Sequence, residues 1–224
     1  MLEYFKQFLT SSDFICRVNL LIENAPKESR ARSGKYKLFY SEVYPIKTLL
    51  EAKKRIWQNI KIKLYLDKKN HADAQIQGLK NIEYLEITEV GFDKYEYFSM
   101  LQLNKTGYSW PISPDRKIDD CKKFYNTNKN TSILFRTYCR EDAYQQFVEH
   151  IINAINKKQQ KYTRYNRPNT ALLVSVDDYG RIGQVDLSGK LTQLLKATNF
   201  NKGPFTNIFI VGRGRNTLYF EFND

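Results

Sequence analysis

The chain has 224 residues, of which 42% are hydrophobic and 27% charged, and this balance excludes an intrinsically disordered protein. With 10 glycines and 6 prolines, the chain is neither collagen-like nor linker-like. A net charge of +12 is typical of proteins that bind acidic partners, most often nucleic acid, and a lysine-rich solvated surface is the alternative interpretation.

The three cysteines, Cys16, Cys121 and Cys139, are odd in number and widely spaced, which argues against a disulfide framework. With His71 and His150 as the only histidines, they form no zinc-binding pattern. We therefore expect a reducing, cytoplasmic location. The N-terminal segment lacks the apolar core of a signal peptide, and no run approaches the roughly 18 apolar residues that span a bilayer.

The first 44 residues carry weak patterns. We expect a short helix over residues 3–9 and a strand over residues 14–22. A polar, basic loop is expected over residues 25–34. Weak alternation of apolar and polar side chains then indicates a second strand over residues 36–43.

The pattern is clearer from Pro45, which suits the first turn of a helix with apolar side chains at helical spacing. Strict alternation then predicts a half-buried strand over residues 60–66. A second short strand is expected over residues 72–77. The third strand, over residues 82–90, is mostly apolar and should therefore lie at the centre of a sheet.

The C-terminal half contains the strongest single element, an amphipathic helix expected over residues 141–162. Before it, residues 91–130 are aromatic and irregular, because prolines after Trp110 and Ser113 exclude a continuous helix. The other expected elements are strands over 133–138, 171–176, 207–211 and 218–222, and a helix over 191–197.

Local strand pairing followed by strand–helix–strand crossovers predicts an α/β fold, with a mixed β-sheet flanked by helices on both faces. No break in composition marks a domain boundary. We therefore expect a single α/β domain over residues 1–224, with residues 1–44 as an N-terminal extension packed on a core of about 45–222. The residues expected at the centre of the core are Phe147, Ile151, Ile152, Leu172, Val174, Ile208 and Ile210.

Two acidic residues, Asp73 and Glu86, lie on the second and third strands expected after Pro45. A turn at Gly78 would fold these strands into a hairpin and bring the carboxylates together. The two-residue period of a strand places Glu86 and Thr88 on one face. Mg²⁺ usually takes one or two carboxylates together with substrate phosphate oxygens, so the pair is a candidate metal site. Alternatively, Asp73 caps a strand end and Glu86 pairs with a nearby lysine.

On this element order and these acids, the chain resembles the PD-(D/E)XK nuclease-like superfamily, which has the restriction-endonuclease-like fold. The family core runs helix, three strands, helix, strand, which is the order expected here over residues 45–176. The family motif places an Asp on the second strand and Glu-x-Lys on the third, where this chain has Asp73 and Glu86-Ile87-Thr88. The resemblance implies a hydrolase with Asp73 and Glu86 as catalytic ligands of Mg²⁺ or Mn²⁺. Thr88 replaces the lysine that helps to activate water, which leaves open whether the site is active.

A substitute for the missing lysine is Lys158, on the long helix. At about 100° per residue, Lys158 lies about 50° from the centre of the apolar face, beside the sheet. We therefore predict Lys158 as a third catalytic residue, and the alternative is a lysine whose stem lies along apolar surface. Glu51, on the helix expected to begin at Pro45, is a further candidate acid for the site. The alternative is that Glu51 is simply an exposed charge.

A basic and aromatic run ends the long helix and follows it. Cations bind phosphates and aromatic rings stack on bases, so this run predicts a nucleic-acid-binding surface. A basic helix end that complements the helix dipole is the alternative. The residues predicted to bind nucleic acid are Lys157, Lys161, Tyr162, Arg164, Tyr165 and Arg167.

Two functions of different classes follow. The first is a nuclease-like protein acting on nucleic acid, with DNA the favoured partner, or a descendant that only binds it. The second is a non-catalytic interaction protein whose basic face contacts a protein, nucleic acid or membrane. The spacing of Asp73 and Glu86 favours the first function, and Thr88 favours the second. Convergence of the two carboxylates at one open position would discriminate between them.

Overall fold

A seven-stranded mixed sheet lies at the centre of the computed structural model, in the order β1-β2-β3-β4-β5-β6-β7. The structure describes residues 2–25, 35–66, 72–90, 140–162, 167–176, 187–198, 200–213 and 217–222. The strands are β1 (Leu9–Thr10), β2 (Lys61–Leu64), β3 (Ala74–Gln77), β4 (Tyr84–Val90), β5 (Thr170–Val176), β6 (Ile208–Gly212) and β7 (Thr217–Phe222). The predicted α/β fold with a mixed sheet is confirmed, and the strand expected over 133–138 lies outside the described residues.

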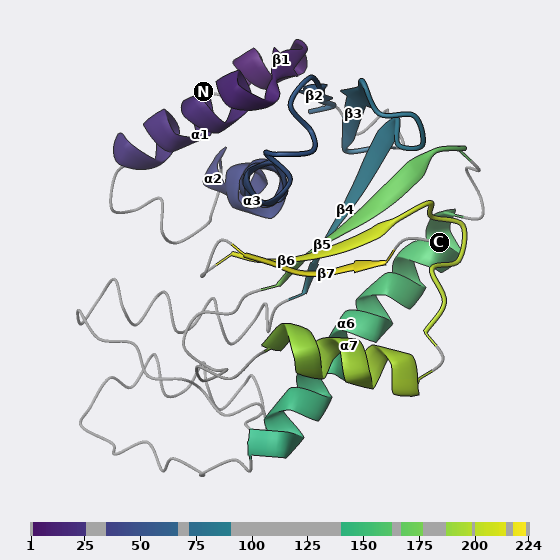
Figure 1. The fold of residues 1–224 in the computed structure, drawn as a ribbon. Helices are drawn as coiled ribbons and strands as arrows, with labels where there is room; N and C mark the ends of the chain where they lie inside the picture. Colours follow the sequence, from purple (N-terminus) through teal and green to yellow (C-terminus); the bar gives the residue numbers. More distant parts are fainter. Residues whose placement is uncertain are drawn as a thin grey trace, which may run out of the picture.

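The sheet changes from antiparallel to parallel at β4. Strands β1 to β4 pair antiparallel, β4 to β6 pair parallel, and β7 returns antiparallel to β6. Parallel neighbours need crossover connections, and these contain α6 (Arg140–Tyr162) and α7 (Leu187–Ala197). Figure 1 shows α6 and α7 on one side of the sheet, with α1 (Ser11–Glu23) and α3 (Tyr44–Ala52) on the other. Helices therefore cover both faces, as predicted.

Residues 11–23 form the helix α1, so the predicted strand over residues 14–22 is wrong. The hydroxyl of Thr10 accepts a hydrogen bond from the backbone N–H of Asp13 at 3.1 Å and caps the first turn. Phe14 and Val18, one helical turn apart, are both fully buried. The cap and this i, i+4 apolar pair outweigh the strand preference of the β-branched residues in the segment, Ile15, Val18 and Ile22. Before α1, the short helix expected over residues 3–9 is limited to the 3₁₀ turn η1 (Glu3–Lys6), and Leu9 belongs to β1 instead.

Residues 35–43 are also helical, where a strand was predicted. The helix α2 (Lys35–Leu38) and the π-helical turn η3 (Phe39–Val43) lead directly into α3. Phe39 and Val43 are buried four residues apart, so the side chains that suggested alternation belong to a helical stripe. Pro45 lies in the first turn of α3, as predicted. Because β1 also pairs with β2, the N-terminal residues contribute to the sheet itself.

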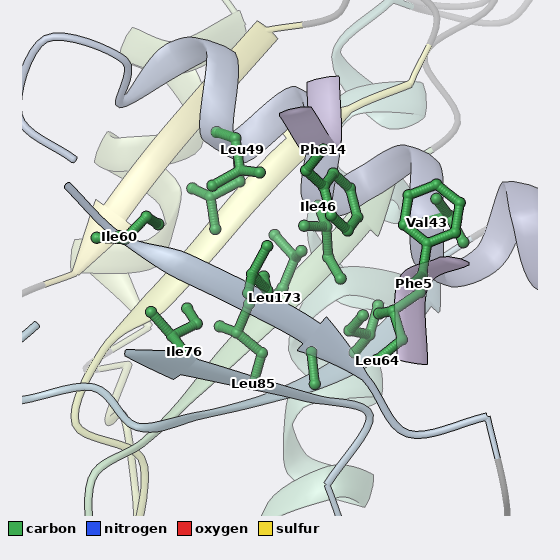
Figure 2. Packing of buried hydrophobic residues seen from close by; sticks show 14 of the residues in the cluster. Phe5, Phe14, Val43, Ile46, Leu49, Ile60, Leu64, Ile76, Leu85 and Leu173 are labelled. Carbon is green, nitrogen blue, oxygen red and sulfur yellow. The ribbon is translucent and has the colours of Figure 1, made fainter. Parts of the chain in front are cut away.

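The described residues form one apolar cluster on each side of the sheet. In the first cluster, side chains from η1, α1, η3 and α3 pack against the face of the sheet that α1 and α3 cover. Figure 2 shows Phe14 and Ile46 above Leu85 and Leu173 in this cluster. In the second, Ile151 and Ile155 of α6 pack with α7 against the opposite face. Within the described part of the chain, no helix combines the length and apolar character needed to cross a membrane.

Most of the predicted core is present in the second cluster. Its fully buried members include Ile151, Leu172, Val174, Ile208 and Ile210. Ile152 is only partly buried at the margin of the cluster, because the next position on α6 turns away from the sheet. The side chain of Phe147 lies outside the described residues.

Candidate active site

Asp73 and Glu86 meet because β3 and β4 pair as the predicted hairpin. Gly78 turns the chain after β3 with a φ of 98°, a left-handed conformation that favours glycine. The register pairs Ala74 with Leu85, and the backbone N–H of Asp73 donates to the carbonyl oxygen of Leu85 at 3.0 Å. Asp73 therefore lies opposite Glu86, on the face of the sheet that α6 covers.

The two strands part at this point. The β3–β4 ladder stops at Ala74 and Leu85, whereas β4 continues to Val90. Beyond the ladder, the side chain of Asp73 contacts the backbone of β4, because its Oδ2 accepts a hydrogen bond from the backbone N–H of Ile87 at 2.6 Å. This bond satisfies a backbone donor of β4 and fixes the carboxylate. The Asp73 side chain keeps 29% of its surface exposed.

Lys158 of α6 completes the cluster. Its Nζ donates a hydrogen bond to Oε2 of Glu86 at 2.8 Å and lies 3.8 Å from Oδ2 of Asp73. The side chain of Glu86 is 9% exposed and that of Lys158 is 26% exposed, so the cluster is closed at Glu86 and open towards Asp73. We call Asp73, Glu86 and Lys158 the triad. The structure thus brings together the three residues predicted as catalytic.

Burial and charge set the protonation of the triad. Burial raises the pKa of Glu86, the charges of Lys158 and Arg167 lower it, that of Asp73 raises it, and the net shift is upward. Burial alone would lower the pKa of Lys158, but the charges of Asp73 and Glu86 outweigh burial, and the pKa is raised. Lys158 is therefore an ammonium at neutral pH and serves as the counter-ion of both carboxylates.

The triad is thus a partly open charged cluster at the point where two strands separate. No protein-family model, curated protein or solved structure matches this chain. What the triad can do therefore follows from its own geometry and charge.

Two further acids lie on the helical segment that η3 and α3 form together. Glu51 of α3 pairs with Lys47 at 3.0 Å, one helical turn away, and is not part of the triad. Glu42 of η3 lies close enough to Lys158 that its charge raises the lysine pKa. Sequence reasoning missed Glu42 because residues 36–43 were expected to form a strand. Recognising Phe39 and Val43 as a helical pair would have placed Glu42 on a helix that enters α3.

The predicted nucleic-acid-binding residues separate on the structure. Lys157 and Lys161 are exposed on α6. The guanidinium of Arg167 lies over the ring of Tyr84, and its charge lowers the pKa of Glu86. Two of the predicted nucleic-acid-binding residues, Arg164 and Tyr165, fall outside the described part of the chain.

Tyr162 requires a correction. Its ring is 4% exposed and packs against Phe205, with 4.8 Å between ring centroids. Its hydroxyl donates a hydrogen bond to the backbone carbonyl oxygen of Arg167. A ring held in the core is not available to stack on a base, so Tyr162 belongs to the apolar stripe of α6.

The triad offers two carboxylates to a divalent cation. Within the described residues, no group of three or more His, Cys, Asp and Glu side chains is arranged to hold a metal ion. Mg²⁺ needs fewer protein ligands, because it keeps several waters and takes substrate phosphate oxygens. Asp73 and Glu86 fit this requirement as hard oxygen donors, and Lys158 already places one positive charge against both. A cation bound there would have to share or replace the contacts of the lysine.

Proposed function

We propose that this chain is a metal-dependent nuclease in which the triad carries phosphodiester hydrolysis. The observation that carries the proposal is the contact of one ammonium with two carboxylates, one on β4 and one just before β3, at 2.8 and 3.8 Å. Buried ion clusters add little to stability, because desolvation offsets the attraction between the charges. Clusters of titratable groups with shifted pKa values, partly open to solvent, are instead typical of functional sites.

The order of the elements supports the same proposal. Within the described residues, the elements α3, β2, β3, β4, α6 and β5 come in the order of the PD-(D/E)XK core that the sequence resembles. Asp73 directly precedes β3 and Glu86 lies within β4, in keeping with the family motif. Thr88 occupies the motif position of the lysine, and Lys158 brings an ammonium to the acids from α6. A restriction-endonuclease-like core is therefore part of the proposal.

Each member of the triad has a separate role in the proposed reaction. Asp73, fixed by the N–H of Ile87, and Glu86 would hold Mg²⁺ or Mn²⁺. The cation would polarise a phosphate oxygen and lower the pKa of bound water. Lys158 has three donors, so it can orient the attacking water and offset the negative charge that develops on the phosphate. Because an ammonium cannot accept a proton, the proton of the water passes to a phosphate oxygen of the substrate.

The charge of the chain supports a polyanionic substrate. The net charge is +12, and exposed Lys157 and Lys161 lie on the same helix as Lys158. Arg167 adds a cation next to Glu86. Positive charge around a site raises the local concentration of nucleic acid and speeds its encounter. The triad therefore lies where a nucleic-acid backbone would be attracted.

Cleavage of plasmid and single-stranded circular DNA tests the proposal. We expect nicking by the wild-type protein in Mg²⁺ or Mn²⁺ and none in EDTA. Asp73→Asn keeps an oxygen that can accept from Ile87 but removes the charge, and should lower the rate by about 10²-fold or more. Glu83→Gln is the matched control. Glu83 is exposed just before β4, so this variant should cleave DNA at the wild-type rate. Equal rates for Asp73→Asn and wild type would contradict the proposal.

A non-catalytic interaction protein is the second candidate, and one observation favours it. Lys158 compensates both carboxylates without any metal ion, as a purely structural ion cluster would. Its basic surface would then bind a partner without cleaving it. Absence of metal-dependent nicking from a folded protein that still binds DNA would select this candidate.

A further inference from the structure

One face of β2 and β3 adjoins the triad and carries polar side chains. Alternate residues of both strands are buried in the cluster shared with α1 and α3, and these are Ile62, Leu64, Ala74 and Ile76. The intervening residues lie on the opposite face and are partly or fully exposed, and these are Lys61, Lys63, Gln75 and Gln77. This second face is the one on which Asp73 lies, two residues before Gln75.

The strand register aligns the side chains of this face in rows that run next to the triad. Lys63 pairs with Gln75, and Gln75 pairs with Tyr84, so the three side chains form a row across the strands. In the next row, the N–H of Tyr65 donates to the carbonyl oxygen of Asp73 at 2.9 Å. That row continues into Glu86, so a ligand crossing the face reaches the triad.

Aromatic rings hold the cations of this face in place. The Nζ of Lys63 lies 4.7 Å from the ring centroid of Phe8 and 5.0 Å from that of Tyr65. The guanidinium of Arg167 lies 5.0 Å from the ring centroid of Tyr84. Cation–π contacts of this kind fix long, flexible side chains before a ligand arrives. Both ends of the first row therefore carry a positioned cation and a ring.

We infer that this face binds single-stranded nucleic acid and delivers it to the triad. The surface, called here the strand face, consists of Phe8, Lys61, Lys63, Tyr65, Gln75, Tyr84 and Arg167. Unpaired bases stack on aromatic rings and on guanidinium planes, whereas duplex bases already stack on one another. Cationic side chains next to these rings can contact the backbone phosphates between the stacked bases. Cleavage of the bound nucleic acid rests on the proposed function, whereas its binding to this face does not.

Fluorescence anisotropy in EDTA tests binding without hydrolysis. The probes are a labelled single strand of about 20 nucleotides and the duplex of the same sequence. The wild-type protein should bind the single strand about tenfold more tightly or better. Tyr65→Leu keeps apolar bulk and removes the ring, so single-strand affinity should fall about five- to hundredfold while duplex affinity is unchanged.

Paired lysine variants separate position from net charge. Lys61→Ala/Lys63→Ala should flatten the dependence of log K on log salt by about 1.4, since each single-strand phosphate contact contributes about 0.7. Lys54→Ala/Lys196→Ala removes the same charge from exposed positions outside the strand face and should leave the slope unchanged. Equal slopes for the two double variants would overturn the inference.

The outcomes for the strand face and for the nuclease are distinguishable. Single-strand preference that depends on Tyr65 and Lys63, without nicking in Mn²⁺, supports the strand face and overturns the nuclease. Nicking by a protein that binds duplex and single strand equally supports the nuclease and overturns the strand face.

Discussion

Lys158→Met should lower the single-turnover rate of DNA cleavage on the order of 10²- to 10³-fold, the range for loss of one positioned donor. Methionine keeps the length and apolar stem of the side chain and removes only the ammonium. The same substitution removes the ammonium that contacts the carboxylates of both Glu86 and Asp73. It should therefore lower the free energy of unfolding by about 1.5–3 kcal/mol in metal-free buffer.

Mn²⁺ should restore most of the stability that Lys158→Met loses, because a divalent cation can replace the missing ammonium between the carboxylates. Lys196→Met is the matched control, since Lys196 is exposed on α7 outside the triad and the strand face, and the variant should change neither rate nor stability appreciably. Wild-type cleavage by Lys158→Met would remove Lys158 from the mechanism and leave it as a structural partner of Glu86.

Ile151→Ala should lower the free energy of unfolding by about 2–5 kcal/mol. Ile151 is fully buried between α6 and the sheet, so truncation leaves a cavity in the second cluster. Ile152→Ala is an internal control of identical chemistry at the next, partly buried position and should cost about 1 kcal/mol. Urea unfolding of both variants measures the difference. Equal costs would show that α6 meets the sheet through a different stripe.

The parts of the fold that follow from sequence are those with a clean period. Alternation over residues 60–66 predicted β2, and the apolar stripe over residues 141–162 predicted α6. Apolar runs without alternation also predicted β5 and β6, and the structure buries every residue of both strands. In these segments, local pattern and tertiary burial agree.

The N-terminal helices could not be predicted in the same way. Residues 14–22 mix β-branched and aromatic side chains, a composition that favours strands when it is considered alone. The deciding signals are the Thr10 cap with Asp13 and the burial of Phe14 with Val18, which depends on packing against α3. Tertiary contacts therefore override local preference in this segment.

Ion pairs between residues far apart in the chain are a second kind of structural feature that the sequence does not indicate. Arg213 directly follows β6, and its side chain is 1% exposed and pairs with Glu89 of β4. Lys53 pairs with Glu221 of β7 in the same manner. Partners this far apart in the chain are set by the sheet order, which no local pattern contains.

The triad was predictable in part. Strand period and the turn at Gly78 placed Asp73 opposite Glu86, and helix geometry brought Lys158 to the same face. Tyr162 lies on the same helical face, and its predicted role in base stacking failed because that face is the buried one. Glu42 was missed because its approach to Lys158 depends on the helical course of η3.

The melting temperature in millimolar Mn²⁺ tests most directly whether the triad is a cation site. At about 100 times the dissociation constant, binding stabilises the folded state by about 2.7 kcal/mol, which raises the melting temperature of a chain this size by about 5–10 °C. The account predicts this rise for the wild-type protein and for Glu83→Gln, and its loss in folded Asp73→Asn and Glu86→Gln. No rise in the wild-type protein, or the same rise in all four proteins, would contradict it.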